Sequence, residues 1–164
     1  MQRILVIGCP GGGKTTFANA LGAKLGIPAY HLDKFFWKGN WTPTPEDECR
    51  KIQNELMQGP GWIIDGNFTN VINSRIMAAD TIILFDFPKI ISFWRTQKRF
   101  LQNFGTVRPD MGGGNKEALR WIHIKYILTF SRKKFRTKIT ELTGNKKLIV
   151  LRSPKEVAQF LKKC

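Results

Sequence analysis

The chain of 164 residues is poor in cysteine and in long apolar runs, and each shortage argues against a class of protein. Its three cysteines, Cys9, Cys49 and Cys164, show no Cys-x-x-Cys spacing and no nearby histidine pair, which indicates neither a zinc site nor a disulfide framework. No apolar run approaches the roughly 20 residues that cross a membrane. A strand is expected almost at the start, leaving no room for a signal peptide. We therefore expect a cytoplasmic protein with no membrane partner.

Acidic residues are also scarce: 12 Asp and Glu stand against 27 Lys and Arg, for a formal net charge of +15. Residues 1–88 hold eight residues of each sign, whereas residues 89–138 hold thirteen basic and only two acidic residues. A concentrated positive field favours polyanions, either nucleotide phosphates or nucleic acid. The segment 89–138 is therefore a candidate nucleic-acid surface.

Short apolar strands alternate with helical patterns along the chain, and the length suits one domain spanning residues 1–164. This alternation predicts an α/β fold with a parallel sheet covered by helices on both faces. The expected strands are residues 4–7, 29–32, 62–64, 81–85 and 148–151. The expected helices are residues 16–25, 45–58, 70–79, 88–104, 116–142 and 154–162.

Residues 8–15 read Gly-Cys-Pro-Gly-Gly-Gly-Lys-Thr, the pattern of a phosphate-binding loop between a strand and a helix. Glycines let successive backbone N–H groups point at an anion, and the following helix presents its positive end to the same phosphates. The lysine reaches the β- and γ-phosphates, and the hydroxyl after it ligates Mg²⁺. The pattern predicts binding of ATP or GTP with Mg²⁺ by Gly8, Pro10, Gly11, Gly12, Gly13, Lys14, Thr15 and Thr16.

Three aspartates follow expected strands: Asp33, Asp65 and Asp86. Ligands collect at the carboxyl ends of parallel strands, so these side chains are expected beside the phosphate loop. Two stretches there, residues 31–45 and 105–115, are expected to be loops. The first is rich in aromatic residues, among them Trp37, which are expected either to line an acceptor pocket or to pack in the core.

The phosphate loop, Asp65-Gly66, and Phe85-Asp86-Phe87-Pro88 followed by Arg95 and Arg99 together resemble the adenylate-kinase-like P-loop kinases. Within them, Tyr30-His31-Leu32-Asp33 and the run from Trp62 to Asn67 are similar to the branch of DNA topology modulation proteins. The resemblance implies a three-layer α/β/α P-loop NTPase fold with about five parallel strands and a short lid over about residues 105–116. It also implies that Asp65 holds Mg²⁺ through water, that Arg95 packs on the adenine and that Arg99 reaches the triphosphate.

The chain departs from that family after Asp65-Gly66, where Asn67 and Thr69 stand in place of the family's phenylalanine and phosphate-gripping arginine. AMP is therefore expected to be a poor acceptor, although Arg75 could supply an anion contact from the next helix. Asp33 is expected either to orient or deprotonate an acceptor hydroxyl, or to cap a helix.

We expect a Mg²⁺-dependent kinase that transfers the γ-phosphoryl group of a nucleoside triphosphate to a small acceptor. Lys14, Asp33 and Arg99 are its candidate catalytic residues, Thr15 and Asp65 its metal residues, and Asp33, Trp37 and Arg75 its acceptor residues. Arg120, Arg132 and Arg136 are candidate lid contacts, and His31 is taken as structural. The alternative function is a nucleotide-regulated nucleic-acid-binding protein that modulates DNA topology.

Overall fold

Five parallel strands form the main sheet in the order β2-β5-β1-β6-β7. The computed structural model describes residues 1–104, 106 and 121–164, with the backbone alone at residues 103 and 121–124. The α/β fold with five parallel strands is thereby confirmed. The central strand, β1, carries the glycine loop at its carboxyl end, so its neighbours β5 and β6 flank that loop. The strands are β1 (Arg3–Gly8), β2 (Ala29–His31), β5 (Trp62–Asp65), β6 (Thr81–Phe85) and β7 (Lys147–Leu151).

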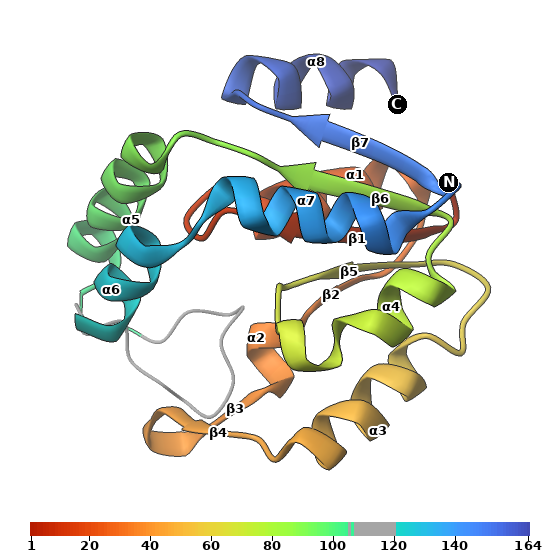
Figure 1. Cartoon of the computed structure of the whole chain (residues 1–164), viewed down its shortest axis with the longest axis horizontal. Helices are drawn as coiled ribbons and strands as arrows, with labels where there is room; N and C mark the ends of the chain where they lie inside the picture. Colours follow the sequence, from red (N-terminus) through yellow and green to blue (C-terminus); the bar gives the residue numbers. More distant parts are fainter. Residues whose placement is uncertain (105, 107–120) are drawn as a thin grey trace.

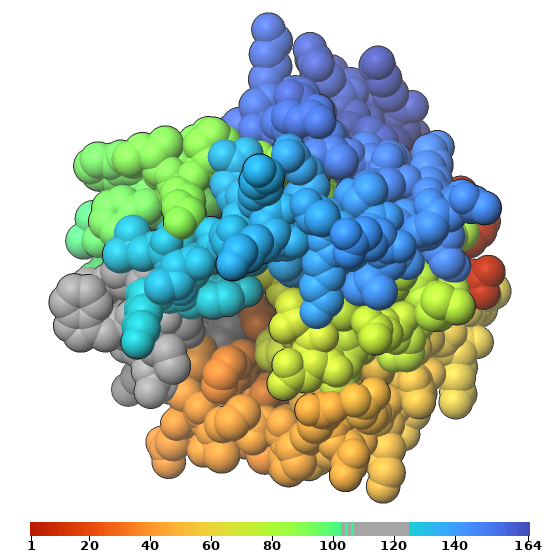
Figure 2. All heavy atoms as spheres, in the orientation of Figure 1, coloured from red at the N-terminus to blue at the C-terminus, as the bar shows by residue number. Residues whose placement is uncertain are grey.

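Helices cover both faces of this sheet, giving three layers (Figure 1). One face is covered by α1 and α8, and the other by α4 and α7. In Figure 2, α7 in blue spreads across the visible face, between α5 in green and α4 in yellow-green. The helices of eight or more residues, together with α4, are α1 (Lys14–Leu25), α3 (Glu46–Leu56), α4 (Ile72–Ala78), α5 (Lys89–Asn103), α6 (Trp121–Thr129), α7 (Arg132–Thr143) and α8 (Pro154–Lys163).

The central strand supplies side chains to two separate cores, because successive side chains of a strand point to opposite faces. Leu5 and Ile7 pack in the core that contains Ile139 of α7, whereas Ile4 and Val6 pack in the core with Phe17 of α1. All four side chains of the strand are fully buried. Burying an aliphatic side chain of this size contributes about 1.5–3 kcal/mol, so the continuous apolar run fixes the strand in the middle of the molecule.

The prediction of one continuous helix over residues 116–142 is wrong, because α6 ends at Thr129 and a separate helix, α7, begins at Arg132. Ser131 is extended there, with φ −85° and ψ 96°. The ring of Phe130 is buried in the core on the α1 side of the sheet and packs against Phe135 at a centroid distance of 5.1 Å. Burial of this ring and the ion pair between Arg132 and Asp86 fix the turn. Since neither proline nor glycine marks the break, helical periodicity alone did not reveal it.

The segment expected as a loop over residues 31–45 contains regular structure. β2 ends at His31, two residues before Asp33, and Asp33 lies in the first turn of the short helix α2 (Leu32–Phe35). The strands β3 (Trp37–Lys38) and β4 (Thr42–Pro43) then form a small antiparallel sheet. The expected lid over about residues 105–116 lies outside the described residues, apart from Thr106, and so does the candidate lid contact Arg120.

Within the described part of the chain, none of the helices combines the length and the apolar character that crossing a membrane requires.

Candidate active site

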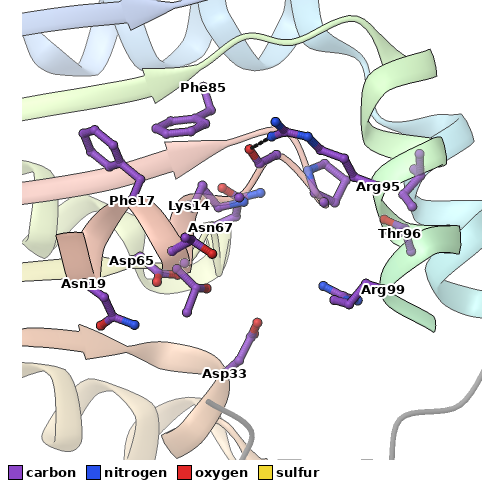
Figure 3. A pocket seen from close by; sticks show the side chains of 18 of the residues that line it. Lys14, Phe17, Asn19, Asp33, Asp65, Asn67, Phe85, Arg95, Thr96 and Arg99 are labelled. Atoms are coloured by element: carbon purple, nitrogen blue, oxygen red, sulfur yellow. Dashed lines mark hydrogen bonds between the residues drawn. The ribbon is translucent and has the colours of Figure 1, made fainter. Parts of the chain in front are cut away.

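A cavity of about 1110 Å³ opens at the carboxyl edge of the main sheet (Figure 3). Its walls come from segments far apart in the sequence: the glycine loop, α1, α2, the end of β5, α5, α6 and α8. Such an edge is where α/β sheets bind ligands. The predicted site residues that line it are Pro10, Gly11, Gly12, Gly13, Lys14, Thr15, Thr16, Asp33, Trp37, Asp65, Arg95 and Arg99.

The glycine loop requires its glycines. Gly11 and Gly13 have φ values of +69° and +88°, which side chains rarely adopt. A Cβ on Gly11 would lie 2.4 Å from the hydroxyl oxygen of Thr96, so α5 packs directly on the loop. Gly13 precedes α1 and provides no side-chain cap, so the first N–H groups of this 12-residue helix remain available to an anion.

Lys14 lies at the base of the cavity and is bonded to its own loop. Its Nζ donates to the carbonyl oxygens of Cys9, at 2.9 Å, and Gly8, at 3.3 Å. Burial lowers the pKa of Lys14, while the nearby carboxylates of Asp65 and Asp33 oppose that shift. The ammonium group therefore lies within the electrostatic reach of both carboxylates that line the cavity.

Helix α5 brings two arginines to the same cavity. Nη1 of Arg95 donates to the carbonyl oxygen of Gly12 at 2.8 Å (Figure 3), and the guanidinium lies 5.6 Å from the ring centroid of Phe87. Arg95 therefore packs against the loop itself. Arg99 follows one turn later and lies across the cavity from Asp33 (Figure 3). The two arginines share one helix face, as their spacing predicted.

Asp65 forms a hydrogen-bonded chain that the sequence did not reveal. Its Oδ2 lies 2.6 Å from Nδ1 of His31, and Nε2 of His31 lies 2.9 Å from Oδ1 of Asn19. His31 and Asp65 are register partners on adjacent parallel strands, and Asn19 lies one turn after Thr15 on α1. His31 thus orients a carboxylate of the cavity, whereas the sequence treated it as only structural. The signal in the sequence that could have indicated this contact was the position of His31 near the end of an expected strand.

Asp86 follows β6 as Asp65 ends β5, yet it does not line the cavity. Its Oδ1 accepts from Nε of Arg132 at 2.8 Å, and its Oδ2 accepts from Nη1 of Arg136 at 3.1 Å. Arg132 also donates to the backbone carbonyl of Asp86 at 2.8 Å. Arg132 and Arg136 therefore attach α7 to the end of β6, which is a different place from the lid contacts expected of them.

Arg75 is likewise placed away from the cavity. It is fully buried and donates to the carbonyl oxygens of Gly66, Asn67 and Phe68 at 2.7–3.0 Å. Burial lowers its pKa to about 10, and the nearby Cys49 thiol slightly opposes that change. Arg75 shapes the loop after Asp65 from below, so the anion contact expected from it is not what the structure shows.

Asp33 and Trp37 occupy the other side of the cavity, opposite the glycine loop and α5 (Figure 3 shows Asp33). Trp37 packs edge-on against Trp41 at a centroid distance of 6.0 Å, and Phe68 lies on the same side. In the 31–45 segment, Phe36 is buried in the core, whereas Trp37 and Trp41 line the cavity. The acceptor role of these rings stays a prediction. The cavity therefore has a cationic half and a half with carboxylates and rings.

The chain matches no known family model and no curated protein sequence. Solved structures do match its fold. The shikimate kinase of Acinetobacter baumannii in complex with shikimate is 16% identical and aligns over 99% of this chain and 90% of that chain, with a TM-score of 0.61. The gluconokinase of Sinorhizobium meliloti 1021 is 13% identical over 99% and 88% of the two chains, with a TM-score of 0.57.

A second shikimate kinase, from Bacteroides thetaiotaomicron, is 14% identical over 99% of this chain and 95% of that chain, with a TM-score of 0.56. At these identities the likeness concerns the fold: an α/β sheet with the strand order of P-loop kinases, flanked by helices on both faces.

Proposed function

We propose that the protein is a Mg²⁺-dependent phosphotransferase that moves the γ-phosphoryl group of ATP or GTP to a hydroxyl group of a small acceptor. The observation that carries this proposal is that one and the same cavity is lined by the glycine loop with Lys14 and by two carboxylates from separate elements, Asp33 and Asp65. A glycine turn without catalytic purpose would not need carboxylates from two other elements within reach of its lysine.

The nucleotide would bind along the cationic half. The N–H groups at the start of α1 and the glycine loop would hold its phosphates, and Lys14 would exchange its two carbonyl partners for phosphate oxygens. Arg99 would contribute a forked guanidinium to the transferring group, where negative charge shifts during the reaction.

The oxygen donors at the base of the cavity fit Mg²⁺, a hard cation with oxygen ligands. Among the residues that the structure describes, no cluster of three or more acidic, histidine or cysteine side chains could hold a metal ion by itself. Thr15 and Asp65 would therefore hold Mg²⁺ together with phosphate oxygens, as is usual for this ion. When bound, Mg²⁺ supplies charge neutralisation at the β- and γ-phosphates. His31 would keep the carboxylate of Asp65 oriented toward the ion.

The acceptor would bind between the carboxylates and the rings. Its hydroxyl oxygen forms a bond to the γ-phosphorus, the bond from that phosphorus to the bridging oxygen breaks, ADP leaves, and the hydroxyl proton passes to the carboxylate of Asp33. Kinases of shikimate and gluconate, whose fold this chain shares, support a small hydroxylated acceptor. AMP is not favoured, because Arg75 is already bonded to three carbonyl groups.

The decisive experiment measures ATP binding by calorimetry and ADP release with a panel of small alcohols, nucleosides and nucleotides. We expect Lys14→Ala to abolish ADP release and to weaken ATP binding strongly. Lys24→Ala is the matched control, because Lys24 is an exposed lysine in the last turn of the same helix. Equal affinity and equal activity of Lys14→Ala and the wild type would overturn the nucleotide site. Turnover of AMP at about 1–100 per second would overturn the exclusion of AMP.

Nucleic-acid binding through the basic segment 89–138 stays a prediction. One observation favours it: Trp94 on α5 is 65% exposed, and an exposed ring beside basic residues offers a stacking surface for single-stranded nucleic acid. Two of the segment's arginines, Arg132 and Arg136, are instead occupied by Asp86. A salt titration of binding to random-sequence DNA tests it, since a surface that follows phosphates gives a steep fall of log K with log salt concentration.

A further inference from the structure

The side-chain amide of Asn67 holds the peptide groups at the start of the glycine loop. The N–H of Gly8 donates to Oδ1 of Asn67 at 2.9 Å, and Nδ2 of Asn67 donates to the carbonyl oxygen of Gly8 at 2.9 Å. A backbone N–H can only donate, so this pair of bonds also fixes which end of the amide is the oxygen. Gly8 itself has φ +126°, and a Cβ there would lie 2.2 Å from the carbonyl oxygen of Phe85.

The same amide reaches a second element. Nδ2 carries two hydrogens, and it also lies 3.2 Å from the hydroxyl oxygen of Tyr126 on α6. Asn67 lies 59 residues after Gly8 and 59 residues before Tyr126 in the sequence. One amide thus connects the first residue of the glycine loop to a helix that is distant in the sequence. Asn67 and Tyr126 line the cavity, whereas Gly8 does not.

This arrangement matters when Lys14 changes partners. The carbonyl oxygen of Gly8 accepts from both Asn67 and Lys14. If Lys14 turns toward phosphates, that carbonyl keeps its bond to Asn67, so the loop is not left with an unpaired buried acceptor. An unpaired buried polar group would cost about 1–3 kcal/mol. The loop can therefore release its lysine without losing its shape.

We propose that Asn67 is a positioning residue that couples occupancy of the phosphate loop to the placement of α6 through the hydroxyl group of Tyr126. The inference rests on nucleotide binding as proposed above. Because coupling is reciprocal, a nucleotide that orders the loop also orders α6, and loss of the link to α6 weakens nucleotide binding. A merely structural amide would affect stability without transmitting binding to α6.

Tyr126→Phe is the sharpest test, because it removes one hydroxyl group and leaves the ring in place. The chain offers a matched control in Tyr30→Phe, since Tyr30 is the only other tyrosine and lies in β2. The measurements are the dissociation constant of ADP by calorimetry and amide hydrogen exchange of residues 8–25 and 121–129 with and without ADP.

In the wild type and in Tyr30→Phe, we expect ADP to slow exchange in both segments. In Tyr126→Phe, ADP should slow exchange in residues 8–25 but leave residues 121–129 unchanged, and the dissociation constant should rise about fivefold, as expected for one neutral hydrogen bond. Asn67→Ala should show the same loss of response in α6. In that background, Tyr126→Phe should have no further effect.

The inference is overturned if ADP binds and slows exchange in residues 8–25 while α6 responds equally in the wild type and in Tyr126→Phe, or responds in neither. A wild-type protein that does not bind ADP would instead overturn the proposed function. If Asn67→Ala does not fold, Tyr126→Phe alone decides between these outcomes.

Discussion

The ends of β5 and β6 flank the same central strand, and each places an aspartate that is only 4% exposed, yet the two have different surroundings. Asp65 at the end of β5 lines the cavity and contacts His31. Asp86 after β6 contacts Arg132 and Arg136 of α7 instead. A buried carboxylate needs compensating partners in either place. The element that packs beside a strand end therefore decides whether the aspartate of that strand lines the cavity or holds a helix in place.

The largest expected effect separates the two aspartates by activity. Asp65→Asn keeps an oxygen for His31 but removes the charge offered to Mg²⁺, so we expect kcat for ADP release to fall at least about 100-fold. The free energy of unfolding should change by less than about 1 kcal/mol, because the hydrogen bond to His31 remains. Steady-state kinetics and urea denaturation measure the two quantities. A kcat within threefold of the wild type would remove Asp65 from the site.

The converse effect is expected at the other strand end. Asp86→Asn leaves two guanidinium groups without their anion and should lower the free energy of unfolding by roughly 2–3 kcal/mol. This value is moderated because both arginines are partly exposed, so solvent screens their attraction to Asp86. The dissociation constant of ADP should change less than twofold. Asp47→Asn, at an exposed position on α3, is the control for the loss of one carboxylate. Unchanged stability would show that the arginines do not hold α7.

The end of β6 is expected to contribute to catalysis through α5 and not through Asp86. Arg99→Lys keeps the positive charge but loses the forked geometry that suits phosphate oxygens. We expect kcat to fall about tenfold, or roughly 1.4 kcal/mol at the barrier, with a much smaller change in the affinity for ATP. A loss confined to nucleotide affinity would place the role of Arg99 in ground-state binding.

The smallest effect concerns a third aspartate, Asp80, which precedes β6 at the opposite edge of the sheet. Burial alone would raise the pKa of Asp80, but the N–H groups of Arg3 and Gln2 and the hydroxyl of Thr81 outweigh it and hold the pKa below its ordinary value of 3.8. A lowered pKa stabilises the fold above the unfolded-state value, and this contribution disappears as pH falls through the folded-state value.

Asp80→Asn should therefore lower the free energy of unfolding by about 1 kcal/mol at pH 7, and the difference from the wild type should shrink below about pH 4. Urea denaturation at several pH values measures it. A difference that stays constant from pH 7 to pH 3 would mean that the effect does not come from the charge of Asp80.

The sequence predicted those features that depend on near neighbours. Gly11 and Gly13 stand between a β-branched apolar run and a helical pattern, and such a local order admits few conformations. β1, β5 and β6 were recognised because buried parallel strands need continuous apolar runs. The edge strands β2 and β7 are only partly buried and were recognised as short apolar runs between helical patterns. The spacing of Arg95 and Arg99 fixed their common helix face in the same way. These features include the fold and the glycine loop of the candidate site.

Only the tertiary structure decided which distant residues meet. His31 reaches Asp65 across 34 residues, Arg132 reaches Asp86 across 46, and Asn67 reaches Gly8 across 59. The break between α6 and α7 also follows from a distant contact, because Arg132 is held at the end of β6. The order of the strands and the placement of the helices determine these pairs. Both depend on the burial of apolar side chains from many parts of the chain. The sequence by itself therefore determined the strands and the glycine loop, whereas the packed sheet determined the partner of each aspartate.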